Sequence, residues 1–186
     1  MLIIGITGTL GAGKGTIVDY LEGKKGFAHY SVRAYITEEL LLRKLIVNRD
    51  NMVGVANELR AAHSPSYIVE QLYEQALSSY KNCIIESIRT PGEVDALKTK
   101  GNFYLFAVDA PAEIRYRRIT RRASETDNVS FEIFIENEKR EMQSTDPNKQ
   151  NISRCIEMAD YVFENDGSVE ELREKVDAVI ELIMKK

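Results

Sequence analysis

The sequence is poor in the residues that mark metal-binding, secreted and membrane proteins. It has no tryptophan, two cysteines, two histidines and four prolines among 186 residues. Cys83 and Cys155 stand apart from any CxxC or Cys/His spacing, which excludes a structural zinc site of the usual kind and favours a reducing compartment. A run of about 18 apolar residues is also missing, so we expect no membrane span and no signal peptide.

Positive charge is not in excess either. Lysine and arginine total 25 against 29 acidic residues, a net charge of −4. This balance disfavours a protein held on nucleic acid by bulk electrostatics. The hydrophobic fraction of 44% is ordinary for a globular chain long enough to bury a sizeable core. We therefore expect a soluble cytoplasmic protein with neither nucleic acid nor membrane as its partner.

Strand-like and helical segments alternate along the chain. Short apolar runs typical of strands lie at 2–6, 27–30, 82–87, 103–109 and 161–165. Helical spacing of apolar residues covers 14–23, 33–45, 49–62, 66–80, 91–99, 111–123, 130–143 and 168–184. The segments from Thr90 to Glu93 and from Ser168 to Glu171 carry the signature of a capped helix start. This alternation predicts an α/β protein with a five-stranded parallel sheet flanked by helices, in one domain of residues 1–186.

The first helix follows the segment GTLGAGKGT, residues 8–16. A strand, a glycine-rich loop and a helix in this order form a phosphate-binding loop, because backbone N–H groups and the helix N-terminus converge on one concavity. Gly8, Gly13 and Lys14 match the G-x-x-x-x-G-K pattern, whereas Gly15 stands where Ser or Thr is usual and Thr16 follows it. A glycine-rich turn without a ligand is the alternative. Four glycines around a lysine directly after an apolar strand favour phosphate.

A second basic segment, RYRRITRR (115–122), holds five arginines. On a helix, Arg115, Arg118 and Arg122 share one face, whereas Arg117 and Arg121 share another. We expect the first face to meet a nucleotide and the second to remain in solvent, since arginine is planar, always charged and bidentate toward phosphate. A basic helix that contacts RNA is the alternative, and it conflicts with the net negative charge.

Several segments resemble the nucleoside monophosphate kinases and their relatives among the P-loop kinases. GAGKGT (11–16) resembles the loop of adenylate kinases, and IIESIRTPGEVDAL (84–97) is similar to the family's third strand and its D-G-F-P-R-T turn. AVDAPAEIRYRRITRR (107–122) resembles the fourth strand and the lid entrance, and ADYVFENDGSVEEL (159–172) is similar to the last strand and helix of dephospho-coenzyme A kinases. Residues 48–72 look closer to small predicted nucleotide kinases. The resemblance implies a three-layer P-loop kinase fold with a helical acceptor-binding insertion at about 31–67 and a short lid at about 123–130.

ATP and Mg²⁺ are the cofactors that the resemblance implies. ATP would be bound by the loop residues Gly8, Gly11, Ala12, Gly13, Lys14, Gly15 and Thr16. Lys14 would hold the β- and γ-phosphates, Arg118 would flank the ATP base, and Arg122 would touch the phosphates. Because Gly15 offers no side chain to the metal, we expect Mg²⁺ on phosphate oxygens and on waters ordered by Glu86.

The acceptor phosphate is expected near Arg89, with Ser31, Arg33 and Arg60 of the insertion contributing. Arg140 would complete the clamp on the transition-state charge, and a surface pair with Glu136 is its alternative. Glu93 follows Arg89 by four positions, where several family members read the acceptor base. A carboxylate there would accept from an exocyclic amine and reject thymine or uracil. Capping of the helix at 91–99 explains the same glutamate without any base.

These features predict an ATP-dependent phosphotransferase whose catalytic residues are Lys14, Arg89, Arg122 and Arg140. Its acceptor would be a nucleoside or deoxynucleoside monophosphate, a small-molecule partner, and the protein would act as a monomer or homodimer. A kinase for another small acceptor, dephospho-coenzyme A first, is one alternative, although FAHYSVRAY (27–35) replaces the Asp-Ala-Asp expected there. A nucleotide-dependent switch is another, although its N-K-x-D motif has only the partial match NKQN (148–151).

Overall fold

The protein is built on one parallel sheet, seen in a computed structural model that describes residues 1–122 and 129–185. Its strands are β1 (Ile3–Gly8), β2 (Ala28–Ser31), β3 (Cys83–Glu86), β4 (Phe103–Asp109) and β5 (Tyr161–Glu164). They lie in the order β2-β3-β1-β4-β5, and every neighbouring pair is parallel. The predicted five-stranded parallel sheet is thereby confirmed.

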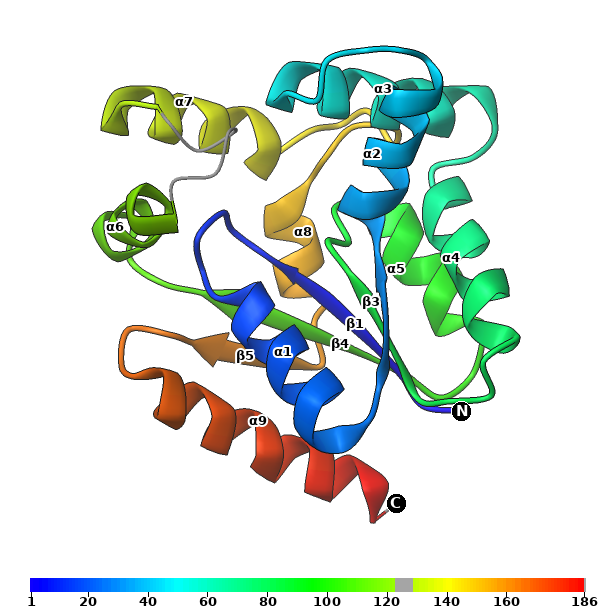
Figure 1. Ribbon diagram of the computed structural model, residues 1–186, viewed down its shortest axis with the longest axis vertical. Helices are drawn as coiled ribbons and strands as arrows, with labels where there is room; N and C mark the ends of the chain where they lie inside the picture. The colour runs from blue at the N-terminus through cyan, green and yellow to red at the C-terminus, as the bar shows by residue number, and fades with distance from the viewer. Residues whose placement is uncertain (123–128, 186) are drawn as a thin grey trace.

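Helices cover both faces of this sheet (Figure 1). They are α1 (Lys14–Lys25), α2 (Val32–Leu42), α3 (Arg49–Ala62), α4 (Tyr67–Leu77), α5 (Pro91–Lys98), α6 (Ala112–Arg122), α7 (Phe131–Met142), α8 (Ile152–Glu157) and α9 (Val169–Met184). Both predicted capping boxes are confirmed, at the starts of α5 and α9. The six-residue helix α8 was not predicted. None of the helices in the described part of the chain is long and apolar enough to span a bilayer.

The central strand β1 contributes to two hydrophobic cores, because successive side chains of a strand point to opposite faces. Ile3 packs into the core beneath α2, α3, α4, α5 and α8, whereas Ile4 and Ile6 pack into the core beneath α1 and α9. Strands buried on both faces read as continuous apolar runs, as IIGI does here. This burial fixes the position of the loop that follows β1.

The carboxyl ends of parallel strands meet at one edge of the sheet, which is where α/β proteins bind ligands. In this protein that edge receives the loop after β1, Glu86 at the end of β3 and Asn165 directly after β5. Helices α2 and α3 extend beyond the sheet on one side of this edge, and α6 and α7 extend on the other (Figure 1).

The structure describes the predicted insertion fully and the predicted lid only in part. The helical insertion predicted at about 31–67 contains α2 and α3 and ends at the first residue of α4. Of the short lid predicted at about 123–130, residues 123–128 lie outside the described residues.

Candidate active site

A cavity of about 500 Å³ lies at the carboxyl edge of the sheet. The structure brings most of the predicted site residues into its lining: Gly11, Gly13, Lys14, Gly15, Thr16, Arg33, Glu86, Arg60, Arg89, Arg118 and Arg122. Residues of α2 within 32–36, residues of α3 within 49–60 and residues 86–89 border one end, and the glycine-rich loop and α6 border the other. Ser31, predicted to bind substrate, is not among the described residues of this lining. A cavity volume in this range is typical of sites that bind small molecules.

The glycine-rich loop owes its path to three glycines with a positive φ, Gly8, Gly11 and Gly13. A Cβ at Gly8, where φ is 133°, would stand 2.0 Å from the carbonyl oxygen of Val108. A Cβ at Gly13, where φ is 114°, would stand 2.3 Å from Nδ2 of Asn165. Gly13 is also the N-cap of α1 and supplies no side-chain hydrogen bond. The first N–H groups of α1 are thereby left for an anion, as a phosphate-binding loop requires.

Asn165 supports this loop from behind, and sequence analysis missed it. The side chain is buried, and its Nδ2 donates to the carbonyl of Ala12 at 2.7 Å. Arg118 of α6 donates to the same carbonyl and to Oδ1 of Asn165, both at 3.5 Å. Asn165 and Arg118 therefore hold the predicted phosphate loop in place at Ala12. Gly8 and Ala12 are both buried and are not among the described residues of the cavity lining. An asparagine ending the last strand was the only sequence signal of this support.

Lys14 lies half-buried at the base of the cavity. Its Nζ donates to the carbonyls of Gly8 and Thr9, both at 2.8 Å. Burial first and the positive charge of Arg89 second lower the pKa of Lys14 to about 7, against the opposing effect of Glu86. The charged form of Lys14 is destabilised in the unliganded site. A phosphate group beside it would strongly stabilise that charged form.

Glu86 is held by two residues of the neighbouring strand β2. The parallel register places Ser31 beside Glu86, and the Ser31 hydroxyl donates to Glu86 Oε2 at 3.5 Å. His29 Nε2 lies 3.3 Å from the same oxygen. Burial raises the pKa of Glu86, but the contact with His29 and the charge of Lys14 outweigh it, so its pKa lies below the ordinary value. Glu86 is therefore an ionised carboxylate on the cavity wall.

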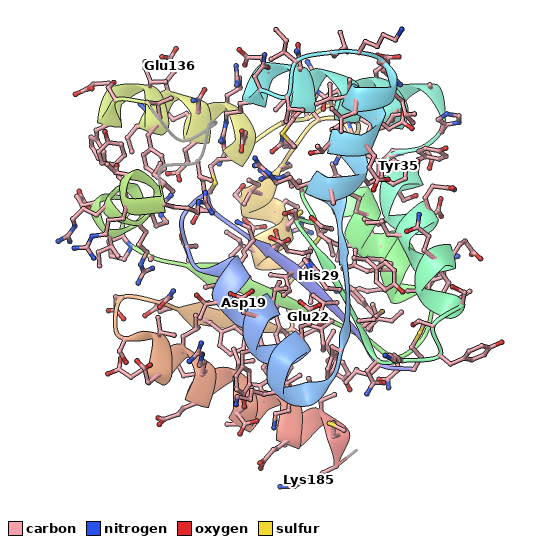
Figure 2. All side chains as sticks on the ribbon, viewed as in Figure 1. Asp19, Glu22, His29, Tyr35, Glu136 and Lys185 are labelled. Carbon is pink, nitrogen blue, oxygen red and sulfur yellow. The ribbon has the colours of Figure 1, made fainter. Side chains whose placement is uncertain are left out.

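His29 was not predicted to take part in the site. Its contact with Glu86 raises its pKa against the effect of burial, and the negative charges of Glu22 and Asp19 on α1 raise it further (Figure 2). Asp19 also lines the cavity. The next residue after Glu86 is equally unusual, since Ser87 is a buried non-glycine residue with φ of 70°. Strained backbone of this kind clusters at functional sites.

Arg89, predicted at the acceptor phosphate, belongs to a cluster drawn from three elements. Its Nη1 donates to Glu141 of α7 and to Gln150, both at 2.8 Å. Arg49 of α3 donates to the other Glu141 oxygen at 2.6 Å. Glu141 is 5% exposed, so its carboxylate is a buried clamp between two arginines. Sequence analysis missed Arg49, Glu141 and Gln150 because no local pattern joins them.

Arg60 and Glu93 form a buried ion pair, with a distance of 2.8 Å from Arg60 Nη2 to Glu93 Oε1. The exposed fractions of their side chains are 1% and 0%. Two roles were left open for Glu93 from sequence, reading the acceptor base through its carboxylate and capping its helix. The structure disfavours base reading by Glu93, because Glu93 is not among the described residues of the cavity lining and its oxygens accept from Arg60 and from the backbone N–H groups of Arg89 and Thr90. The capping alternative describes the observed role.

The arginines of α6 divide as predicted into two sets. Arg118 and Arg122 line the cavity, and Arg117 and Arg121 are exposed. Arg115 shares the inner face but is buried, where it donates to the carbonyl of Ala110 at 2.6 Å and pairs with Glu138 of α7.

Arg140, predicted to complete the charge clamp, lies away from the other predicted residues. Its side chain is 51% exposed and donates to Asp50 of α3 at 3.2 Å. It is not among the described residues that line the cavity, and its ion pair is with Asp50, where the surface alternative had named Glu136. Arg49, one residue before Asp50, lines the cavity instead. The helical period explains the difference, because Glu141 and Arg140 are adjacent on α7 and project in different directions.

Solved structures of similar fold include a shikimate kinase and a dephospho-CoA kinase. Shikimate kinase from Bacteroides thetaiotaomicron superposes with a TM-score of 0.61 at 16% identity, covering 97% of this chain and 98% of that one. Dephospho-CoA kinase from Campylobacter jejuni has a TM-score of 0.52 at 16% identity, covering 97% and 96%. At these identities the likeness shows the fold alone, which is that of the P-loop kinases.

Sequence relatives extend over the whole chain. A UPF0200 protein of Methanococcus vannielii is 30% identical over 99% of this chain and 97% of its own length. A UPF0200 protein of Thermococcus gammatolerans is 27% identical over 99% and 96%. Residues 4–146 match the family model of an AAA domain, which spans the phosphate loop, the insertion and the arginines of α6. With its loop, its sheet and these relatives in agreement, the chain belongs to the AAA_18 family of AAA domains and to the UPF0200 proteins.

Proposed function

We propose that the protein transfers the γ-phosphoryl group of ATP to a nucleoside or deoxynucleoside monophosphate, giving ADP and the diphosphate. The observation that supports this proposal is the make-up of one cavity. One end holds the phosphate loop with Lys14, and the other holds Arg49 and Arg89 beside an apolar wall. The wall consists of Val32, Ile36, Met52, Val53 and Ala56. Two nucleotides that meet at their phosphates suit such a cavity.

ATP suits the loop end. A Cβ built on Gly15 meets nothing within 4 Å, so the start of α1 has open space in front of it. Lys14 would neutralise the outer phosphates, and the Thr16 hydroxyl would donate to an inner one. Arg118 and Arg122 line the cavity from α6 and would flank the base and the phosphates. These donors are fixed by the fold before any charge develops, which is the main source of catalysis in phosphoryl transfer.

Glu86 is the residue that would hold Mg²⁺. An ionised carboxylate beside several phosphate oxygens and waters is the donor set that Mg²⁺ prefers. The ion would supply neutralisation of phosphate charge. His29 and Ser31 keep the Glu86 carboxylate in place through their contacts with its Oε2.

The acceptor phosphate would lie at Arg89 and Arg49. Arg49 Nε is buried without a partner among the described residues, so this cluster retains a donor for an anion. During transfer, an oxygen of the acceptor phosphate forms a bond to the γ-phosphorus while the bond from that phosphorus to the bridging oxygen of ATP breaks, and ADP leaves with the electron pair. Arg33 lines the same end and would contribute charge.

We further propose that residues 1–186 act as one catalytic domain in the cytoplasm, as a monomer or homodimer.

The test is ATP turnover with Mg²⁺ against all ribo- and deoxynucleoside monophosphates, dephospho-coenzyme A and shikimate, with each product identified by mass. We expect one or a few monophosphates to be converted. Arg89→Ala is expected to lower kcat/KM by at least about 100-fold, since it removes a charge that stabilises the transition state. Arg117→Ala on the exposed face of α6 is the control and should leave kcat/KM unchanged.

Other patterns of turnover contradict the proposal. Conversion of dephospho-coenzyme A alone, or of shikimate alone, assigns a different acceptor to the same cavity. ATP binding without turnover of any acceptor identifies a nucleotide-binding protein without transfer activity.

A further inference from the structure

The acceptor end of the cavity contains a buried cation whose orientation is fixed from two sides. Arg60 of α3 donates from Nε and Nη2 to a single oxygen of Glu93, at 3.1 and 2.8 Å. The other Glu93 oxygen accepts the backbone N–H groups of Arg89, at 2.7 Å, and Thr90, at 3.0 Å. The same carboxylate thus caps α5 and aligns the guanidinium. With its rotamer held by two bonds, Arg60 is preorganised.

One donor of this guanidinium is left over. Arg60 Nη1 is buried and has no hydrogen-bond partner among the described residues, although Arg60 lines the cavity. Buried polar groups are nearly always paired, so an unpaired donor at a cavity wall indicates a partner that arrives with the ligand. A guanidinium has donors only, which requires that partner to be a hydrogen-bond acceptor.

The surroundings of Arg60 indicate which part of the ligand this is. On α3, Met52, Val53 and Ala56 line the cavity on the same helical face as Arg60, so the donor stands at the end of an apolar wall. Glu93 neutralises the charge of Arg60, which makes the pair a weak site for a further anion. The phosphate is served by Arg49 and Arg89 at the other end of that face. A flat, uncharged ring with an acceptor atom on its edge fits the remaining place.

We propose that Arg60, positioned by Glu93, determines the base specificity of the acceptor by donating a hydrogen bond to a carbonyl oxygen on the base edge. An exocyclic amine at that place would set donor against donor. This selection is the reverse of the one that base reading by Glu93 itself would give, because a free carboxylate would favour the amine. This inference rests on the proposed function, and it specifies the substrate class within it.

Matched pairs of acceptors test the inference. UMP and CMP differ in carrying an oxo or an amino group at C4, and IMP and AMP differ in the same way at C6. We expect wild-type kcat/KM to favour the oxo member of the accepted pair by at least about tenfold, because the amino member leaves a buried donor unpaired. Dissociation constants measured by calorimetry should show the same preference. Arg60→Gln offers both a donor and an acceptor, so it should bring the ratio close to one.

Arg43→Gln is the matched control. Arg43 forms ion pairs with Glu39 and Glu58, and it is not among the described residues of the cavity lining. It should leave the ratio as in the wild type. Turnover of monophosphates with equal preference, or with preference for the amino member, overturns the inference and leaves the proposed function intact. Absence of turnover with every monophosphate overturns the proposed function, and the calorimetric ratio then decides the role of Arg60. If Arg60→Gln fails to fold, the wild-type ratios are decisive alone.

Discussion

Lys14 illustrates how one residue is prepared by its surroundings for its ligand. Its pKa of about 7 reflects burial first and the nearby charge of Arg89 second. As the pH rises through 7, the unliganded side chain loses the proton that makes it attractive to phosphate. We therefore predict that ATP affinity falls between pH 7 and 9 and that binding at pH 8 takes up a proton. Calorimetry in two buffers with different ionisation enthalpies measures that uptake.

The matched variants for this prediction are Lys14→Met and Lys24→Met, both in α1. Lys24 is exposed in the last turn of the helix. Loss of the proton uptake in Lys14→Met alone is the expected result. An ATP affinity that stays constant from pH 7 to 9 in the wild type would show that Lys14 is fully charged without ligand.

The residues that sequence could predict are those joined by a local pattern. The phosphate loop is continuous from Gly8 to Thr16, and its glycines are required by φ values that belong to the loop itself. The pairing of Arg60 with Glu93 crosses 33 positions and depends on how α3 packs beside the start of α5. The sequence therefore singles out Glu93 by its position after Arg89 but does not identify Arg60 as its partner. Without that partner, the role of the carboxylate could not be decided.

An ion pair between Arg49 and Glu141 connects helices α3 and α7. Arg89, which follows β3, pairs with the same carboxylate. This carboxylate lies where an acceptor phosphate would need the same two arginines. We predict that Glu141→Gln lowers the KM for the acceptor several-fold, because two cations are released for the phosphate. The same change should lower the free energy of unfolding by about 1 to 3 kcal/mol, since the partly exposed arginines lose charged hydrogen-bond acceptors. Steady-state kinetics and urea unfolding measure the two effects.

Glu138→Gln is the control on the same helix, because Glu138 pairs with Arg115 and not with Arg49 or Arg89. It should affect stability without lowering the KM for the acceptor. A higher KM in Glu141→Gln would mean that the carboxylate positions the arginines for the phosphate and does not compete with it.

Helix α8 shows why some elements escaped prediction. With six residues it is too short for helical periodicity to appear in the sequence. The residues before it nevertheless support the site, since the Asn151 N–H donates to the carbonyl of Arg89 at 2.8 Å and Gln150 binds the Arg89 guanidinium. The long helices and the strands were predicted because their burial leaves a repeating pattern. The placement of Arg89 by Gln150 and Asn151 arises only from tertiary packing.

The arrangement of the whole molecule decides how the two ends of the cavity are related. Parallel strands place every strand-to-helix loop at one edge, so a loop after β1, a turn after β3 and a residue after β5 converge although they span more than 150 positions. The insertion between β2 and β3 then places α2 and α3 over the same edge. One continuous cavity with two differently built ends is the consequence.

Continuity of this cavity has a direct consequence for ligands that fill both ends. We predict that a compound joining adenosine to a second nucleoside through a polyphosphate chain binds at least about 100-fold more tightly than ATP, because the second contact is made without a further loss of translational freedom. Calorimetry measures both dissociation constants. Arg89→Ala should remove most of the gain while leaving ATP binding near its wild-type value, since Arg89 belongs to the acceptor end. A tethered compound that binds no more tightly than ATP would show that the two ends do not accept linked nucleotides at the same time.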